Sequence, residues 1–277
     1  MKKHFFIRWL ISSLIFIASA CAAPAPTQTA TLVPVQEPSP TAEALIVTPV
    51  ESAFAPADPT AAPPDDILAS HTVTFETEDG ATINGELYGT GKTAVIFSVM
   101  GNCKPGWREF AQLTAAQDYM ALTYQWRGCK ANSVDQALIQ KFLDDTRAAI
   151  TFVREQGAEK IILVGASLGG CASAKLAVES QASGLVIVAS PPSISQWGFE
   201  IESADLNTDI PKLFITAEND NTVPADSTRA LYDLAAEPKE WQTYPGSAHG
   251  TDLFEGQSAA ELQQRILSFI QMIGSGG

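Results

Sequence analysis

The stretch Gly165-Ala166-Ser167-Leu168-Gly169-Gly170 decides the fold, because it places a serine between a strand pattern and a helix pattern. Residues 160–166 read KIILVGA, an apolar run typical of a strand that is buried on both faces. Residues 168–179 continue with helical periodicity. A G-x-S-x-G sequence in this setting predicts a tight turn that exposes the Ser167 hydroxyl, with glycines that let neighbouring backbone approach closely. A turn of small residues that serves only packing is the alternative interpretation.

The chain beyond residue 66 repeats this alternation of strands and helices. Strands are expected at 71–75, 81–88, 93–99, 119–124, 160–166, 185–189, 212–217 and 240–244. Helices are expected at 107–117, 133–156, 168–179, 225–236 and 258–273. The first two strands flank Glu78-Asp79-Gly80 and indicate a β-hairpin. The alternation predicts an α/β protein with a mostly parallel eight-stranded sheet, helices on both faces and ligands bound beyond the carboxyl ends of the strands.

Residues 1–20 have the pattern of a secretory signal peptide. A basic start is followed by nine mostly apolar residues at 9–17 and by Ala18-Ser19-Ala20, directly before Cys21. The apolar run is shorter than the ~20 residues of a conventional transmembrane helix. The order resembles a bacterial lipobox, which implies an acylated Cys21, a lipid bilayer as partner and a location outside the cytoplasm. Ordinary cleavage after Ala20, with an incidental cysteine, is the alternative.

The next segment differs sharply in composition from the rest. Residues 22–66 contain 10 of the chain's 17 prolines and no Lys or Arg. Such a segment cannot bury a core and is typical of an extended, disordered tether. We therefore expect a signal peptide at 1–20, a lipid-anchor cysteine with a linker at 21–66, and one globular domain at 67–277.

Composition and charge exclude several function classes. The 277 residues are 45% hydrophobic, which excludes a wholly disordered chain. The 17 Lys+Arg against 31 Asp+Glu leave a net charge of −14, which argues against a nucleic-acid partner. The Cys and His residues show no metal-ligand spacing, and no metal or organic cofactor is expected. The oligomeric state is left open.

A nucleophilic serine needs a base, and the chain has three histidines. His4 belongs to the signal peptide and His71 lies at the start of the domain. His249 follows the last expected strand, which places it at the same edge of the sheet as Ser167. We therefore predict His249 as the base. The carboxylate that orients it would come from the loop after strand 212–217, where Glu218 and Asp220 both stand.

Five pieces of the chain carry a resemblance to a known family: FSVMGN at 97–102, YQWRGC at 124–129, GASLGG at 165–170, ENDNTVP at 218–224 and GSAHG at 246–250. Together they resemble the α/β-hydrolase superfamily over Thr72 to Gly277. The nearest likeness is to compact members of the dienelactone-hydrolase and serine-aminopeptidase-like groups. The resemblance implies an α/β-hydrolase fold that carries a Ser-His-Asp triad.

The resemblance also implies the roles of particular residues. The chain order Ser…Asp…His, with the acid shortly before Val-Pro, favours Asp220 over Glu218 as the partner of His249. The oxyanion hole would be formed by the backbone N–H groups of Leu168 and Met100. Many members of the superfamily have His-Gly where this chain has Val99-Met100.

These residues predict a serine hydrolase that works through an acyl-enzyme intermediate. His249 would take the proton of Ser167 during its attack on an acyl carbonyl, and the oxyanion would be met by fixed N–H dipoles. A small ester is the favoured substrate. An amide or peptide hydrolase of the same fold is an alternative, and so is a catalytically silent binding module that keeps the fold.

Two cysteines are expected to lie at one edge of this fold. Cys103 and Cys129 follow two neighbouring strands, and a disulfide between them would persist outside the cytoplasm. Two reduced thiols too far apart to pair are the alternative. Cys171 lies one helical turn after Ser167 and is predicted to be a small core residue.

The segment 191–211 stands where many superfamily members carry a helical lid. Its 21 residues suffice for one short helix and loops. Its acids are Glu200, Glu202, Asp205 and Asp209, and its large apolar residues are Ile194, Trp197 and Phe199. A solvated helix over the core and a wall of the substrate site are equally consistent with this composition. As a wall, it would disfavour anionic substrates and favour short neutral esters.

Overall fold

The computed structural model describes residues 69–101 and 106–275 of the chain. The main sheet contains the strands β1 (His71–Glu76), β2 (Thr82–Tyr88), β3 (Thr93–Val99), β4 (Met120–Gln125), β5 (Lys160–Ala166), β6 (Gly184–Val188), β9 (Lys212–Ala217) and β10 (Lys239–Tyr244). The helices around it are α1 (Arg108–Ala115), α2 (Gln136–Glu155), α3 (Leu168–Ala177), α4 (Ser203–Leu206), α5 (Ala225–Leu234) and α6 (Ala259–Ser275). Short 3₁₀ turns are η1 (Arg127–Lys130), η2 (Ser195–Trp197) and η3 (Gly250–Glu255), and β7 (Ser193–Ile194) pairs with β8 (Phe199–Glu200).

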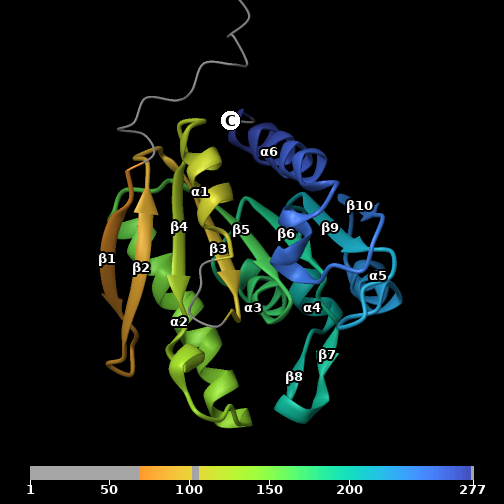
Figure 1. Cartoon of the computed structure of the whole chain (residues 1–277). Helices are drawn as coiled ribbons and strands as arrows, with labels where there is room; N and C mark the ends of the chain where they lie inside the picture. Colours follow the sequence, from red (N-terminus) through yellow and green to blue (C-terminus); the bar gives the residue numbers. More distant parts are fainter. Residues whose placement is uncertain (1–68, 102–105, 276–277) are drawn as a thin grey trace, which may run out of the picture. The chain divides into compact units, whose positions relative to one another are not determined.

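The eight main strands lie in the order β1-β2-β4-β3-β5-β6-β9-β10. Strand β2 is antiparallel to both β1 and β4, and all the other neighbours are parallel. The carboxyl ends of the parallel strands therefore share one edge, which lies at the bottom of Figure 1. The fold class is confirmed: a mostly parallel eight-stranded sheet of the α/β-hydrolase type with an N-terminal hairpin.

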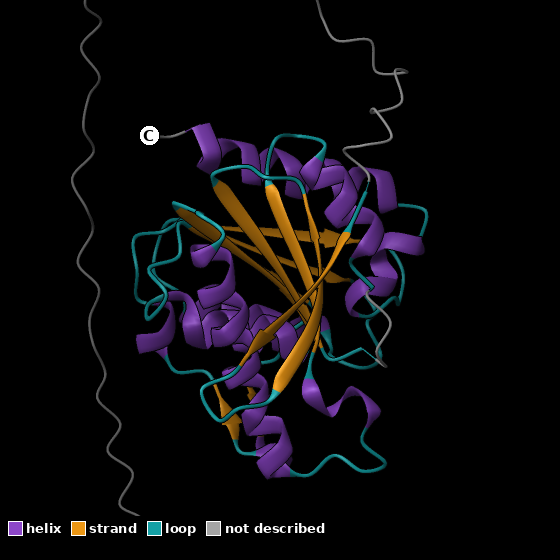
Figure 2. Cartoon of the chain, turned by 90° about the vertical axis from the view of Figure 1, so that its left-hand side faces the viewer, coloured by secondary structure: helices purple, strands orange, loops and turns teal. Residues whose placement is uncertain are grey.

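Side chains of the central strands alternate between two separate cores. In β3, Ala94 and Ile96 contact the core under α2, α3 and α5, whereas Val95 and Phe97 contact the core under α1 and α6. The same alternation runs through β5 and β6, because successive side chains of a strand point to opposite faces. Helices consequently cover both faces of the twisted sheet (Figure 2). The apolar runs at these strands reflect this burial on two sides.

The segment 191–211 is a small substructure on the carboxyl edge of the sheet. Its first half forms the β7–β8 hairpin with η2 at the tip, and its second half contains the four-residue helix α4. The expectation of a single short helix was therefore incomplete, because two-residue strands are too short to show a period in the sequence. The hairpin extends below the sheet, near the start of α2 (Figure 1).

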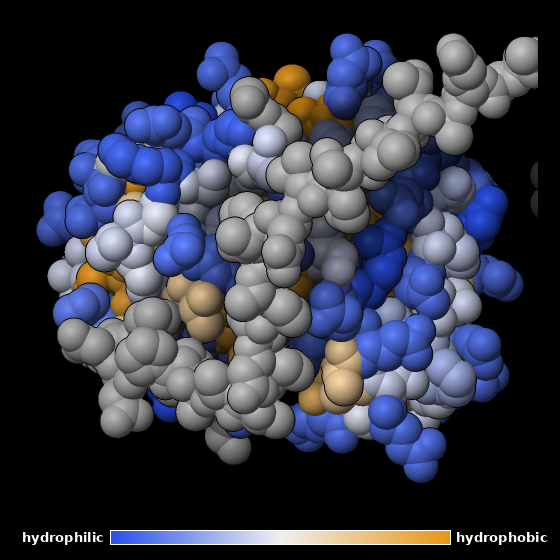
Figure 3. Space-filling model, turned by 90° about the horizontal axis from the view of Figure 1, so that it is seen from above, coloured by the Kyte–Doolittle hydropathy of each residue, from blue (hydrophilic) through white to orange (hydrophobic). Residues whose placement is uncertain are grey.

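The opposite edge, where the parallel strands begin, faces the viewer in Figure 3. Outside the residues drawn in grey, this face is mainly hydrophilic, with hydrophobic residues only in small separate groups (Figure 3). Among the described residues, no helix is long and apolar enough to cross a membrane. The predicted signal peptide, Cys21 and the linker up to residue 66 lie outside the described residues.

Candidate active site

Ser167 lies on a strained turn between β5 and α3. Its φ of 53° and ψ of −127° are rare for a residue with a side chain. The flanking glycines make the turn possible, since a Cβ on Gly165 would lie 2.2 Å from the Gly169 carbonyl oxygen. A Cβ on Gly169 would lie 2.1 Å from the Ser98 oxygen of β3. The glycines that the motif requires are therefore positions of close backbone contact, as the sequence predicts.

The backbone of this turn is held from the neighbouring strand β6. The Ser167 N–H donates to the Val188 carbonyl at 2.9 Å. Ser190, which is fully buried, donates its hydroxyl to the Ser167 carbonyl at 2.8 Å and lies 3.1 Å from the Val188 carbonyl. Ala189 between them also has a positive φ, of 49°. The sequence analysis did not single out Ser190 or Ala189, and no motif marks them.

His249 and Asp220 form a hydrogen-bonded pair at the same edge of the sheet. His249 Nδ1 lies 2.8 Å from Asp220 Oδ2, and a neutral imidazole must donate Nδ1–H here because a carboxylate only accepts. This tautomer leaves Nε2 unprotonated and able to accept a proton. The structure thus brings together the base and the acid that the sequence favours.

The Asp220 carboxylate is fixed by backbone contacts of its own loop. Its Oδ1 accepts hydrogen bonds from the N–H groups of Thr222 at 2.8 Å and Val223 at 2.9 Å. The side chain is completely buried, whereas His249 is 20% exposed. Glu218, the rival carboxylate, is exposed and makes no hydrogen bond to His249 among the described residues. Burial and backbone donors therefore single out Asp220 as the group that orients the imidazole.

Ser167 and His249 are at the same edge but are not hydrogen-bonded to each other in the described part of the chain. Ser167 is half-buried at the carboxyl end of β5, and His249 immediately precedes η3, which follows β10. Catalytic hydrogen bonds are often long without substrate and shorten in the complex.

Two backbone N–H groups near Ser167 are available for an oxyanion. Leu168 begins α3, and the first N–H groups of a helix have no partner within it. Met100 follows β3 directly and lines the same pocket as Ser167. Among the described residues, neither N–H donates to another group. Both groups thus stand where the resemblance implied an oxyanion hole, although residues 102–105 of that loop lie outside the described residues.

The end of β3, which carries Met100, is tied to three neighbouring side chains. Trp107 Nε1 donates to the Ser98 carbonyl at 3.1 Å. The Ser98 hydroxyl lies 3.0 Å from the Tyr124 hydroxyl, which lies 2.7 Å from Thr146 Oγ1 of α2. All four side chains are buried. The buried network gives the start of the oxyanion loop a rigid support.

A pocket of about 350 Å³ opens beside Ser167. Its walls come from the ends of β3 and β5, the β7–β8 hairpin and the loop that leads into α5. The lining residues are Met100, Ser167, Pro191, Ser193, Ile194, Ser195, Gln196, Trp197, Thr222, Val223, Pro224 and Ser227. No charged side chain is among these lining residues.

The segment 191–211 therefore borders the site, but its acids do not. Asp205 pairs with Lys175 of α3 at 2.8 Å and accepts the Glu202 N–H in a capping box at the start of α4. Glu200 is exposed on β8, and neither it nor Asp209 lines the pocket. The expectation that a wall built from this segment would repel anions by its own acids is wrong, because α4 needs those acids and lies away from the pocket.

The predicted cysteine roles are placed only in part. Cys129 of η1 is disulfide-bonded. Cys103 lies outside the described residues, so the Cys103–Cys129 pairing stays a prediction. Cys171 is completely buried in the first turn of α3, its Sγ donates to the Pro191 carbonyl at 3.3 Å, and burial raises the pKa of its thiol to about 12. A thiol held protonated in this way is a core residue, not a nucleophile.

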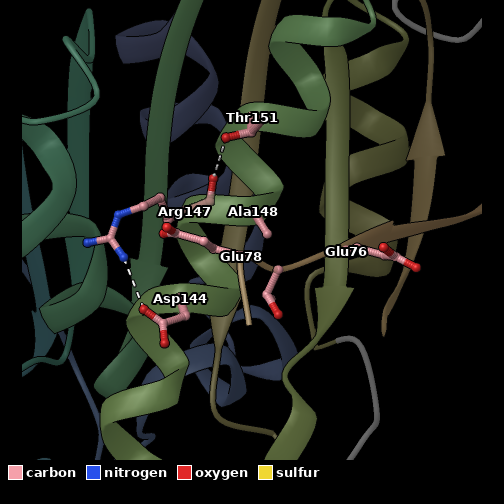
Figure 4. A pocket seen from close by; sticks show the side chains of 7 residues that line it. Glu76, Glu78, Asp144, Arg147, Ala148 and Thr151 are labelled. Carbon is pink, nitrogen blue, oxygen red and sulfur yellow. Dashed lines mark hydrogen bonds and ion pairs between the residues drawn. The ribbon is translucent and has the colours of Figure 1, made fainter. Parts of the chain in front are cut away.

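A second hollow of about 290 Å³ lies between the β1–β2 hairpin and α2 (Figure 4). Glu76, Glu78 and Asp144 surround Arg147 there, and Arg147 Nη1 pairs with Asp144 at 3.1 Å. Arg147 also pairs with Glu179 of the neighbouring α3 end. The described residues include no group of three or more His, Cys, Asp or Glu side chains able to hold a metal ion. The hollow therefore offers an ion-pair network but no reactive group.

A serine on a strained strand–helix turn, with a His–Asp pair at the same sheet edge, is the arrangement of the α/β-hydrolase class. The chain belongs to the dienelactone hydrolase family, whose sequence profile matches residues 101–269. Family membership makes it a hydrolase of this fold.

Individual relatives are more distant. The uncharacterized protein YfhR of Salmonella typhimurium is 25% identical over 241 residues, which cover 73% of this chain and 82% of that protein. A structure of the Pyrococcus furiosus esterase Pf2001 superposes with a TM-score of 0.61 at 15% identity, over 79% of this chain and 96% of the other. XC6422 from Xanthomonas campestris, described as a serine hydrolase without lid, gives a TM-score of 0.57 at 15% identity, over 73% and 94% of the two chains. These likenesses establish the fold.

Proposed function

We propose that the protein is a serine hydrolase that cleaves small neutral carboxylic esters through an acyl-enzyme on Ser167. The observation that carries the proposal is the buried Asp220–His249 pair, with an Nδ1–Oδ2 distance of 2.8 Å, at the sheet edge where the Ser167 turn emerges. The uncharged pocket beside Ser167 supports a neutral substrate.

In the first half-reaction, His249 Nε2 takes the proton of Ser167 Oγ while the oxygen attacks the ester carbonyl carbon. The carbonyl oxygen becomes an oxyanion and accepts hydrogen bonds from the N–H groups of Leu168 and Met100, each worth on the order of 10²–10³ in rate. The bond to the leaving alkoxide then breaks, and the alkoxide takes the proton from His249. Asp220 keeps the imidazole in its tautomer and stabilises the imidazolium.

In the second half-reaction, water takes the place of the alcohol. His249 removes a proton from the water, and the hydroxide attacks the acyl carbon. The bond between the acyl carbon and Ser167 Oγ breaks, and Ser167 recovers a proton from His249. The products are a carboxylic acid, an alcohol and the free enzyme.

The same machinery serves amide bonds, so an amide or peptide hydrolase is the alternative activity at this site. The pocket favours the ester reading only through its size, which is near the lower end of the ~300–1,000 Å³ usual for ligand pockets. A panel of p-nitrophenyl esters and matching p-nitroanilides separates the two.

The test is covalent labelling together with turnover in serine and histidine variants. We expect a fluorophosphonate to label the wild type at Ser167, and Ser167→Ala and His249→Ala each to lose at least about 10³-fold in kcat, because these residues act as a unit. Ser133→Ala and His71→Ala, at exposed positions outside the site, are the matched controls and should keep full activity. Near wild-type turnover in a folded Ser167→Ala protein, or no labelling at all, would reject the proposal; the latter result would favour a silent binding module.

We also propose that the domain works outside the cytoplasm, held to a bilayer by an acylated Cys21. The support is the sequence of residues 1–66: a basic start, a short apolar run, a small-residue site directly before Cys21 and a proline-rich segment after it.

A further inference from the structure

We infer that the pocket beside Ser167 binds the acyl group of the ester, and that Trp197 at the tip of the β7–β8 hairpin limits the length of that group. The inference rests on the proposed function, since it assigns one side of the scissile bond to a named wall of the same site.

The side of the bond follows from which residues line the pocket. The general acid must come within hydrogen-bond reach of the leaving oxygen, so the alcohol leaves on the side of His249. Ser167 and the oxyanion residue Met100 both line the pocket, whereas His249 is not among its described lining residues. A pocket that touches the nucleophile and the oxyanion site but not the acid is therefore on the acyl side of the carbonyl.

The chemistry of the lining matches a neutral acyl chain. Met100, Ile194, Trp197 and Val223 offer apolar surface, and the polar lining residues are neutral hydroxyls and one amide. A carboxylate in the acyl chain would lose hydration there and would meet no cationic lining residue. The acyl class is thus neutral and mainly apolar.

The wall that Trp197 forms is fixed and does not act as a mobile lid. Gln140 of α2 donates its side-chain amide to the Trp197 carbonyl at 3.1 Å and to the Gly198 carbonyl at 3.2 Å. The half-buried Trp197 and Ile194 side chains pack against the core under α2 and α3, and Phe199 is only 3% exposed.

The turn at the tip leaves little freedom of its own. Gly198 has a left-handed φ of 62°, and a Cβ there would lie 2.3 Å from Gln136 Nε2 of α2. Beyond it, Ile194 pairs with Phe199 and closes the hairpin. A wall held at both its backbone and its side chains should give a sharp limit on acyl length.

The experiment compares two substrate series on the full-length protein. In one series, p-nitrophenyl esters vary the acyl group from acetyl to decanoyl; in the other, butanoate esters vary the alcohol. We expect the wild type to lose kcat/KM steeply beyond medium acyl chains and to depend weakly on the alcohol. Trp197→Ala should raise the decanoyl-to-butanoyl ratio of kcat/KM at least tenfold, with the alcohol series unchanged.

Two further variants sharpen the result. Trp197→Phe keeps an aromatic wall and should stay near the wild-type acyl profile. Gln140→Ala removes the amide contacts to the tip and should broaden the acyl profile without a change in the alcohol series. Trp241→Ala, the same deletion at a half-buried tryptophan of β10 outside the pocket, is the matched control.

The outcomes separate this inference from the proposed function. An active Trp197→Ala enzyme whose acyl profile equals that of Trp241→Ala, or whose alcohol preference changes instead, overturns the pocket assignment and leaves the hydrolase in place. A wild type that no fluorophosphonate labels overturns the proposed function, and the inference with it.

Discussion

The Ser167 backbone stores strain that its surroundings keep in place. A side-chain-bearing residue in such a conformation costs on the order of 1–3 kcal/mol and persists only where neighbours over-determine it. Here the N–H of Ser167 bonds to β6, its carbonyl accepts from buried Ser190, and glycines on both sides give the clearance. The consequence is a hydroxyl presented at a fixed position beside the pocket.

Asp220 and Glu218 allow a direct test of which acid orients His249. We expect Asp220→Asn to lower kcat by about 10³–10⁴-fold, since an amide at this position favours the wrong imidazole tautomer. The loss should stay smaller than that of Ser167→Ala. Glu218→Gln, two residues away and exposed, should leave kcat within about twofold. Steady-state kinetics of both variants provide the measurement, and a larger loss in Glu218→Gln would reverse the assignment.

Prediction from sequence succeeded at residues that a local pattern marks. Ser167 has its motif, and His249 follows a recognisable strand at the correct edge, so both could be named before any geometry. Asp220 could be preferred to Glu218 only through the family resemblance, because both acids follow the same strand. Ser190 could not be found, since its role depends on a hydrogen bond across 23 residues of sequence between adjacent strand ends.

At the level of elements, one arginine joins three separate pieces of the chain. Arg127, at the start of η1, pairs with Asp79 in the β1–β2 turn at 2.8 Å and with buried Asp145 of α2 at 2.6 Å. Lys141 of α2 reaches the same Asp79 at 3.0 Å. The N-terminal hairpin is thereby tied to the body of the domain by charge as well as by strand pairing.

This network predicts a dependence of stability on pH. Hydrogen bonds from Arg127, then Thr77 and Lys141, hold the pKa of Asp79 well below its usual range. A carboxyl with a lowered folded-state pKa adds stability above its unfolded pKa of about 4 and loses it as the pH falls toward the folded value. Burial raises the pKa of Asp145, which has the opposite sign: its cost at neutral pH is relieved on acidification.

Asp79→Asn should therefore lower Tm by a few degrees at pH 7 and should flatten the fall of Tm between about pH 5 and pH 3, because the pair is exposed and worth little. Glu78→Gln, at the neighbouring exposed position of the same turn, is the control and should keep the wild-type slope. Thermal unfolding followed by circular dichroism across this pH range measures both. An unchanged acid limb in Asp79→Asn would show that other carboxyls control it.

The elements that the sequence predicted well are those with long, uniform burial. Strands such as β5 and β9 match their expected bounds, because every residue faces one of two cores and the apolar run records it. The β7–β8 hairpin escaped prediction because two paired residues per strand leave no period. The direction of the acids at 200–209 escaped it for a related reason: a four-residue helix has no face that sequence alone can orient.

For the whole molecule, charge and anchoring have to be compatible. A net charge of −14 repels the domain from anionic lipid surfaces, while an acylated Cys21 would keep it attached. The proline-rich residues 22–66, which lack Lys and Arg, would let the domain stand away from the surface. On this hypothesis the anchor and the catalytic domain are independent parts.

That independence gives the last prediction. Full-length protein expressed in a bacterial host should fractionate with membranes, and Cys21→Ala should release it, because no residue would remain to carry the lipid. A fragment of residues 67–277 should be released as well and should keep the kcat/KM and Tm of the full-length enzyme, since both cores and the candidate triad lie within it. Mass spectrometry of the N-terminal peptide should show diacylglycerol on Cys21. Ser19→Ala, close to the anchor site but not the acylated residue, is the matched control and should stay membrane-bound. Membrane retention of Cys21→Ala would contradict the lipid anchor, and loss of activity in the fragment would contradict the boundary near residue 67.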